Sequence, residues 1–193
     1  MDIQKTSVTL LELLHSYRPY DEGEGIHLEE TISFVRSSRN PFSRHTTEGH
    51  ITVSAVLVDH PMEHVLLLWH NKLERWLQPG GHCEPSQDTS LEGAALRELE
   101  EETGVRPAQI EQPLSGPFDI DVHEIPAKGA ESAHLHYDLR YLFKASQGSG
   151  LEIVFDHEES GGYAWRRVTE LHTSGDPSIS RFAKKIAALP SNA

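Results

Sequence analysis

Apolar residues follow two different periods along this chain. Up to about residue 45 they have helical spacing, which predicts one helix around residues 10–14 that ends near Pro19 and a second helix over residues 27–37. From Gly49 onward apolar and polar residues alternate, as in a strand with one buried face. We therefore interpret residues 1–45 as a helical extension and residues 46–193 as the main domain.

The rest of the pattern predicts strands interrupted by one long helix. Further strands are expected over residues 65–70, 76–78, 118–123, 134–145 and 163–168, and helices over residues 91–103 and 182–189. Gly104 suits the left-handed position after the long helix, and Thr89 with Glu92 suggests a capping box at its start. Because strands and helices do not alternate regularly, an α/β layer fold with a mixed sheet is favoured over a doubly wound parallel sheet.

The amino-acid composition limits the binding partners and the cellular compartment that we expect. The 193 residues include 30 acidic and 17 basic ones, a formal charge of -13, and nucleic-acid binding needs the clusters of Lys and Arg that are absent here. No segment approaches the roughly 20 apolar residues of a membrane span. The first residues lack the basic and apolar segments of a secretory signal, and Cys83 is the only cysteine. We expect a cytoplasmic protein that binds neither nucleic acid nor membranes.

The apolar side of the N-terminal helices suggests a homodimer as one hypothesis.

About half of the net charge lies in one short segment. Seven carboxylates and a single base, Arg97, fall between Glu84 and Glu102. Glu98, Glu101 and Glu102 are spaced i, i+3 and i+4, so they share one helix face. They repel one another, and negative charge near the C-terminal end of a helix opposes the helix dipole. A solvated acidic face is one interpretation. The other is a site for Mg2+ or Mn2+, hard ions that prefer carboxylate oxygen.

Residues 81–105 resemble the Nudix box, Gly-x5-Glu-x7-Arg-Glu-U-x-Glu-Glu-x-Gly-U, where U is aliphatic. The second half matches at every fixed position: Arg97, Glu98, Leu99, Glu101, Glu102, Gly104 and Val105. The resemblance implies an α/β/α sandwich and metal-dependent hydrolysis of a diphosphate linkage in a small nucleotide-type substrate. It also implies that Glu98, Glu101 and Glu102 hold Mg2+ or Mn2+, together with the carbonyl of Gly81. Arg97 is placed to orient Glu101, and Glu98 is our candidate for the general base within the box.

The first half of the box departs from the pattern. Fifteen residues separate Gly81 from Arg97 where the pattern has thirteen, and Thr89 stands where a Glu is expected. Asp88 is the closest acidic substitute. Glu84 and Glu92 are its rivals, and Glu92 is expected to serve the helix cap. Asp88 or Glu84 is therefore a candidate for a further ligand or base. So is Glu158 or Glu159, because related Nudix proteins often supply such a group from this region.

A polar strand face lies outside the box. His134, His136, Asp138 and Arg140 alternate with apolar residues, so they share one face of their strand. Two His with an Asp can bind zinc, although polar sheet faces are commoner. We favour a contact of His134, His136 or Arg140 with substrate phosphate, and His123 is expected in the same cleft.

Two other functions remain as alternatives. The stretches around His50 and around His82 and Cys83 faintly resemble isopentenyl-diphosphate isomerase, a Nudix-fold enzyme that uses a cysteine and a His/Glu metal site. A non-catalytic Nudix-fold ligand sensor is the second alternative. The complete set of box carboxylates argues against both, because neither an isomerase nor a sensor needs the hydrolytic cluster. The sequence does not identify the substrate.

Overall fold

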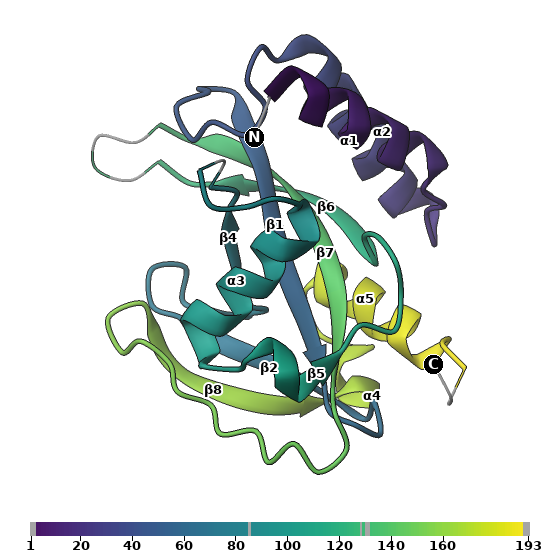
Figure 1. The fold of residues 1–193 in the computed structure, drawn as a ribbon, viewed down its shortest axis with the longest axis vertical. Helices are drawn as coiled ribbons and strands as arrows, with labels where there is room; N and C mark the ends of the chain where they lie inside the picture. Colours follow the sequence, from purple (N-terminus) through teal and green to yellow (C-terminus); the bar gives the residue numbers. More distant parts are fainter. Residues whose placement is uncertain (1–2, 85, 128, 130–131, 191–193) are drawn as a thin grey trace.

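The computed structural model describes residues 3–84, 86–127, 129 and 132–190 (Figure 1). We expected an extension of residues 1–45 and a domain of residues 46–193. The first residues of that extension and the last residues of that domain lie outside the described residues. The strands are β1 (Gly49–Val58), β2 (His64–His70), β3 (Arg75–Leu77), β4 (Gly80–His82), β5 (Ile110–Glu111), β6 (Asp119–Ile125), β7 (His134–Ala145) and β8 (Ser160–Arg167). The helices are α1 (Ile3–Ser16), α2 (Glu22–Ser37), α3 (Leu91–Thr103), α4 (Val168–Leu171) and α5 (Pro177–Ala187), with one 3-10 turn at Pro107–Gln109.

The strands form the mixed sheet that the sequence predicts. The two long strands β1 and β7 are parallel, with His50 opposite His136, and the remaining strand pairs are antiparallel. The other edge of β1 is shared: Val58 pairs with β2, whereas Thr52 pairs with His82 of β4. The sheet therefore divides beside β1 into one arm with β4 and another arm with β2, β3 and β8.

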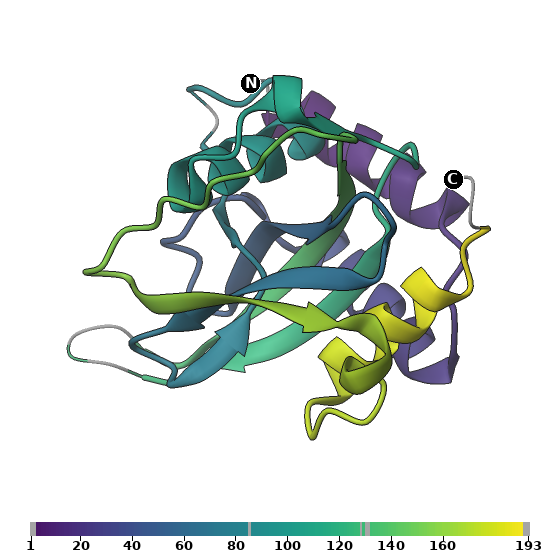
Figure 2. The same cartoon turned by 90° about the horizontal axis from the view of Figure 1, so that it is seen from below.

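Helices cover both faces of the sheet, as the sandwich prediction requires (Figure 2). On one face, α3 packs over alternate residues of β1 and β7 such as Ile51, Val53 and Leu139. On the other face, α4 and α5 pack over Val56 and Leu142. Beyond α5 this second face becomes polar, because the next inward positions of β1 are Ser54, Thr52 and His50. The strand alternation thus produces one apolar face and one face that is only partly apolar.

The apolar side of the N-terminal helices is buried within this chain. Leu10 and Leu14 of α1 and Ile32 and Phe34 of α2 belong to the same core as the sheet residues. The ring of Phe34 stacks on Tyr137 of β7 with 4.1 Å between ring centroids. The surface on which the homodimer hypothesis depended is therefore covered, and the oligomeric state stays a prediction.

A buried network of charged groups joins the N-terminal helices to α5. Glu24 of α2 accepts a hydrogen bond from Lys185 of α5 at 2.5 Å, and Lys185 also contacts Asp119 of β6 at 3.2 Å. Arg140 and Arg181 bind the same Asp119. Along the described part of the chain, no helix has the length and apolar character needed to cross a bilayer.

Candidate functional site

Glu98, Glu101 and Glu102 of α3 line a cavity of about 880 Å³. The helix begins after Ser90, whose Oγ accepts a hydrogen bond from the Gly93 N–H at 3.0 Å. The expectation that Thr89 caps this helix is therefore wrong by one residue, because the neighbouring Ser90 supplies the hydroxyl. Gly104 ends the helix with a φ of 71°, as expected. Burial of the apolar face of α3 turns Glu98 and Glu102 toward the cavity.

Glycines in β4 allow these carboxylates to approach the backbone. A Cβ atom on Gly81 would lie 2.7 Å from Glu98 Oε2, so any side chain there would displace Glu98. The backbone N–H of Gly80 forms a hydrogen bond with Glu102. The side chain of Glu98 is 13% exposed, whereas that of Glu101 is 57% exposed. The three glutamates and both glycines all line the cavity.

Burial and mutual repulsion disfavour the charged form of the glutamates at this site. Burial, followed by the charge of Glu98, raises the pKa of Glu102 to about 8, although the Gly80 N–H acts in the opposite direction. Burial also raises the pKa of Glu98, and Arg97 opposes that shift. A divalent cation would offset both effects, and carboxylate oxygens are the ligands that Mg2+ and Mn2+ prefer. The donor set therefore fits such an ion.

Arg97 is the centre of a network that positions the glutamates. Its Nη1 donates to Glu98 at 2.8 Å and to Glu101 at 2.9 Å, and its Nη2 donates to the carbonyl of His82 at 2.9 Å. Its Nε and Nη2 also bind the two oxygens of Asp88, each at 3.0 Å. Asp88 is only 7% exposed and accepts the Glu84 N–H at 2.6 Å. The geometry makes Asp88 the anchor of Arg97.

The other acidic candidates differ in their surroundings. Glu84 lines the cavity and pairs with Arg44 at 2.5 Å. Glu159 also lines the cavity, and its charge contributes to the raised pKa of Glu102. The lining residues that the structure describes do not include Glu158, whose N–H donates to Asp156 at 2.8 Å. Glu159 is therefore the better placed of this pair.

Arg140 is among the residues that line the cavity, but its donors are already engaged by protein groups. It is 3% exposed and donates to Asp138 at 3.0 Å, Asp121 at 3.0 Å and Asp119 at 3.2 Å. A fourth bond, of 2.5 Å, joins it to Ser178. This arrangement fits a structural cation under the polar face and does not favour the expected contact with substrate phosphate.

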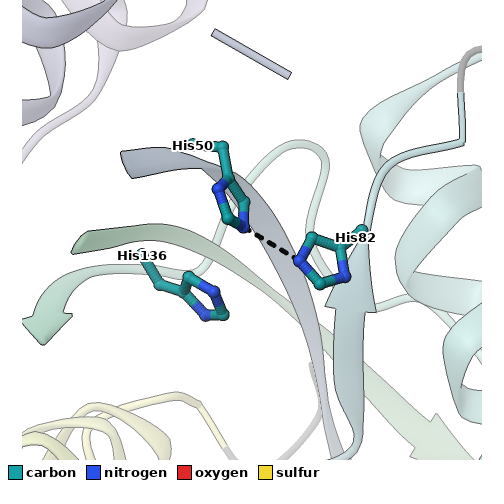
Figure 3. A group of neighbouring side chains, drawn as sticks. All are labelled: His50, His82 and His136. Carbon is teal, nitrogen blue, oxygen red and sulfur yellow. Dashed lines mark hydrogen bonds between the residues drawn. The ribbon is translucent and has the colours of Figure 1, made fainter. Parts of the chain in front are cut away.

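A group of histidines on the polar face was only partly anticipated. His50 of β1, His82 of β4 and His136 of β7 turn their rings toward one another (Figure 3), with one nitrogen of each within 4.8 Å of the others. His134 lies beside them, with its ring centroid 5.0 Å from that of His50, and its Nδ1 lies 2.9 Å from the Ser132 carbonyl oxygen. Burial and then the neighbouring imidazoles lower the pKa of His136 to about 2 and of His50 to about 4. The sequence contains no local signal for this group, because strand pairing alone assembles it.

Cys83 does not face the cavity. It is 3% exposed in the core, and burial raises the pKa of its thiol. A cysteine in this position is not available to a substrate in the cavity, so the fold does not support an isomerase that uses it.

Comparison with known proteins settles the family. The model of the NUDIX domain matches residues 49–186. The chain belongs to the Nudix family. Nudix hydrolases are pyrophosphohydrolases that act on phosphoanhydride bonds, and they typically use divalent metal ions. The resemblance of the box and the activity class expected from it are confirmed.

Solved Nudix structures share this fold at low sequence identity. An Ap4A hydrolase from C. elegans is 19% identical, with a TM-score of 0.56 over 72% of this chain and 95% of that one. A NUDIX hydrolase from Clostridium perfringens is 20% identical, with a TM-score of 0.54 over 73% of this chain and 98% of that one. A Nudix hydrolase from M. smegmatis is 17% identical, with a TM-score of 0.50 over 75% and 88%. At these identities the likeness concerns the fold alone. No curated protein matches this chain significantly.

The rival roles of Asp88 and Glu84 can be separated by substitution. Asp88→Asn removes the charge that holds Arg97, and we expect kcat/KM for the metal-dependent reaction to fall about 10- to 100-fold, as when a supporting partner of a metal site is lost. Glu84→Gln is the matched control, since it leaves the contacts of Arg97 intact, and we expect activity within about twofold of wild type. Equal losses in the two variants would contradict this assignment.

Proposed function

We propose that this Nudix protein is a Mg2+- or Mn2+-dependent hydrolase that cleaves a diphosphate linkage in a nucleoside diphosphate derivative. The observation that carries the proposal is the convergence of Glu98, Glu101 and Glu102 on one cavity, beside glycines that leave their backbone accessible. We assign the carboxylates of these three residues and the carbonyl of Gly81 as the groups that would hold the cation.

The protein's own residues prepare the site for water attack on phosphorus. When bound, a divalent cation neutralises the diphosphate and lowers the pKa of the attacking water. Arg97 fixes the rotamers of Glu98 and Glu101 through two hydrogen bonds, and Asp88 fixes Arg97 in turn. We assign proton acceptance from water to Glu98, because it lies at the cavity wall against Gly81. Glu159 is the second candidate for this role.

The cavity has the size and lining expected for a nucleotide-type substrate. Its volume of about 880 Å³ lies within the range of small-molecule sites. Lys72 and Arg75 are exposed and line it from the β2–β3 arm, where they would attract phosphate. Leu68, Leu73 and Leu77 provide apolar surface on the same arm. The C. elegans neighbour is an Ap4A hydrolase by name, which makes dinucleoside polyphosphates one group of compounds to test.

A hydrolysis screen tests the proposal. The purified protein would be incubated with nucleotide sugars, ADP-ribose, dinucleoside polyphosphates, coenzyme A and nucleoside triphosphates, each with Mg2+, with Mn2+ or with a chelator. We expect phosphoanhydride cleavage of at least one class and its loss, by at least about a hundredfold, when the metal is removed. Turnover that persists undiminished in chelator would refute the metal dependence. Binding without turnover across the whole screen would favour the ligand-sensor alternative.

A further inference from the structure

We propose that His50, His82 and His136 form a site for a transition-metal ion of the Zn2+ class, separate from the carboxylate site. The three residues come from three neighbouring strands, and Figure 3 shows their rings turned toward a shared space. Imidazole is a common ligand of zinc, whereas Mg2+ prefers oxygen. The histidines therefore favour a different metal ion from the one that the glutamates of α3 would hold. The histidine site does not depend on the function proposed for those glutamates.

The spacing of the nitrogens is close to that of a three-histidine centre. One nitrogen of each ring lies within 4.8 Å of the others, and Nε2 of His82 lies 2.9 Å from Nε2 of His50. A tetrahedral zinc ion with bonds of about 2.05 Å places its nitrogen ligands about 3.3 Å apart. Changes of about 0.4 Å in the separation of His50 and His82, and of at most about 1.5 Å in the others, would give this spacing.

The burial of His50 is a second feature of this cluster. This residue is completely buried, and its Nδ1 is among the few buried side-chain atoms of the described residues that have no hydrogen-bond partner. Buried polar atoms are usually satisfied, and leaving one unpaired costs stability. An aliphatic residue would fill this position without leaving a polar atom unpaired. Coordination of a cation through Nε2, the nitrogen that lies 2.9 Å from Nε2 of His82, would offset the cost of burying this ring.

Strand pairing holds the three ligands in place. His50 pairs with His136 across the parallel β1 and β7 strands, and His82 pairs with Thr52, two residues further along β1. His82 and His136 line the same cavity as the glutamates, whereas His50 lies behind them. Three protein ligands leave the fourth position of a tetrahedral ion open, as in catalytic zinc sites. Because His82 and His136 line the cavity, water or a phosphate oxygen from the cavity could take that position.

Cobalt binding tests this site without relying on enzyme activity. Untagged protein would be stripped with a chelator, desalted and titrated with Co2+ in excess Mg2+, which occupies the carboxylate site. We expect one Co2+ per chain with the visible absorption of a four-coordinate ion, and its displacement by one equivalent of Zn2+. His82→Gln and His136→Gln should each weaken binding at least about a hundredfold, since a direct ligand matters more than a supporting partner. Circular dichroism would confirm that each variant is folded.

Two further variants separate this site from other metal-binding groups. His60→Gln changes an exposed histidine in the β1–β2 turn and should bind Co2+ as wild type does. Glu102→Gln should also retain the four-coordinate spectrum, even if its hydrolytic activity is lost. If His136→Gln does not fold, His82→Gln still decides the matter, because His82 is only partly buried at a strand edge. Absence of stoichiometric binding, or a spectrum that survives in both His variants, would overturn the proposal.

Discussion

Replacing Glu102 with Gln should lower kcat/KM for the metal-dependent reaction on the order of 10³-fold, as expected when a preorganised charge-stabilising group is removed. The carboxylate of Glu102 lies beside Glu98 at the cavity and accepts a backbone hydrogen bond from Gly80. Gln has the same shape and can keep that hydrogen bond, but it supplies no negative charge to a divalent cation. Initial rates measured over a range of Mg2+ concentrations would show the loss.

The same substitution should not destabilise the metal-free protein. Burial and Glu98 raise the pKa of Glu102 to about 8, so the folded state disfavours its charge. When the pKa of a carboxyl group is higher in the folded state than in the unfolded state, the protein becomes less stable as the pH rises between the two values. The unfolded pKa of Glu is about 4.3, so this loss extends from there to the raised pKa. Gln removes this loss, so thermal unfolding in chelator at pH 8 should occur at the wild-type temperature or above it.

Glu100→Gln is the matched control for Glu102→Gln. Glu100 lies on the same helix but is exposed and does not line the cavity. It changes the net charge of the chain by the same amount, so a general electrostatic effect on substrate binding would appear in both variants. We expect Glu100→Gln to keep wild-type kcat/KM within about twofold. Comparable losses in the two variants, or full activity of Glu102→Gln, would contradict the assignment of the metal site.

Local patterns predicted most of the fold. Alternation identified β1, β7 and the other long strands, and helical spacing identified α1 and α3. The pattern placed the start of α2 five residues too late, at His27, although Asp21 is its N-cap. It also placed the start of α5 at Phe182, although Asp176 and Pro177 give a start signal there. In both cases the cap residues mark the first turn, which carries little of the apolar pattern.

Tertiary contacts determine what the sequence left open in the site. The spacing of Glu98, Glu101 and Glu102 was readable because all three lie on one helix. The partner of Arg97 depended on which acidic residue before α3 reaches it, and the structure gives that position to Asp88. Strand β4 was unrecognised, because two of its three residues are glycines in what reads as a turn. With β4 missing, nothing in the sequence brought His82 next to His50.

Asp119→Asn should lower the free energy of unfolding by about 3–5 kcal/mol, a large effect for a single substitution outside the site. Asp119 is completely buried on β6 and binds three cations, Arg140, Arg181 and Lys185. Burial alone would raise the pKa of Asp119, but the hydrogen bond from Arg181 and the nearby charge of Arg140 hold it below its usual value. Without this carboxylate, three buried positive charges share fewer partners. Urea unfolding at pH 7 would measure the change in the free energy of unfolding.

Glu111→Gln provides the comparison for that measurement. The pair of Glu111 with Lys144, at 3.6 Å, has a glutamate side chain that is 56% exposed, so its loss should cost less than about 1 kcal/mol. The two variants should also differ in acid. A carboxylate with a lowered folded pKa stabilises the protein above its unfolded pKa of about 3.9 and loses that contribution as the pH falls further. Wild type and Glu111→Gln should therefore lose stability steeply below pH 4, whereas Asp119→Asn, already without this carboxylate, should show a shallower decline. A cost below about 1 kcal/mol for Asp119→Asn would mean that the cations find other partners, and that the network does not hold α5 and the N-terminal helices against the sheet.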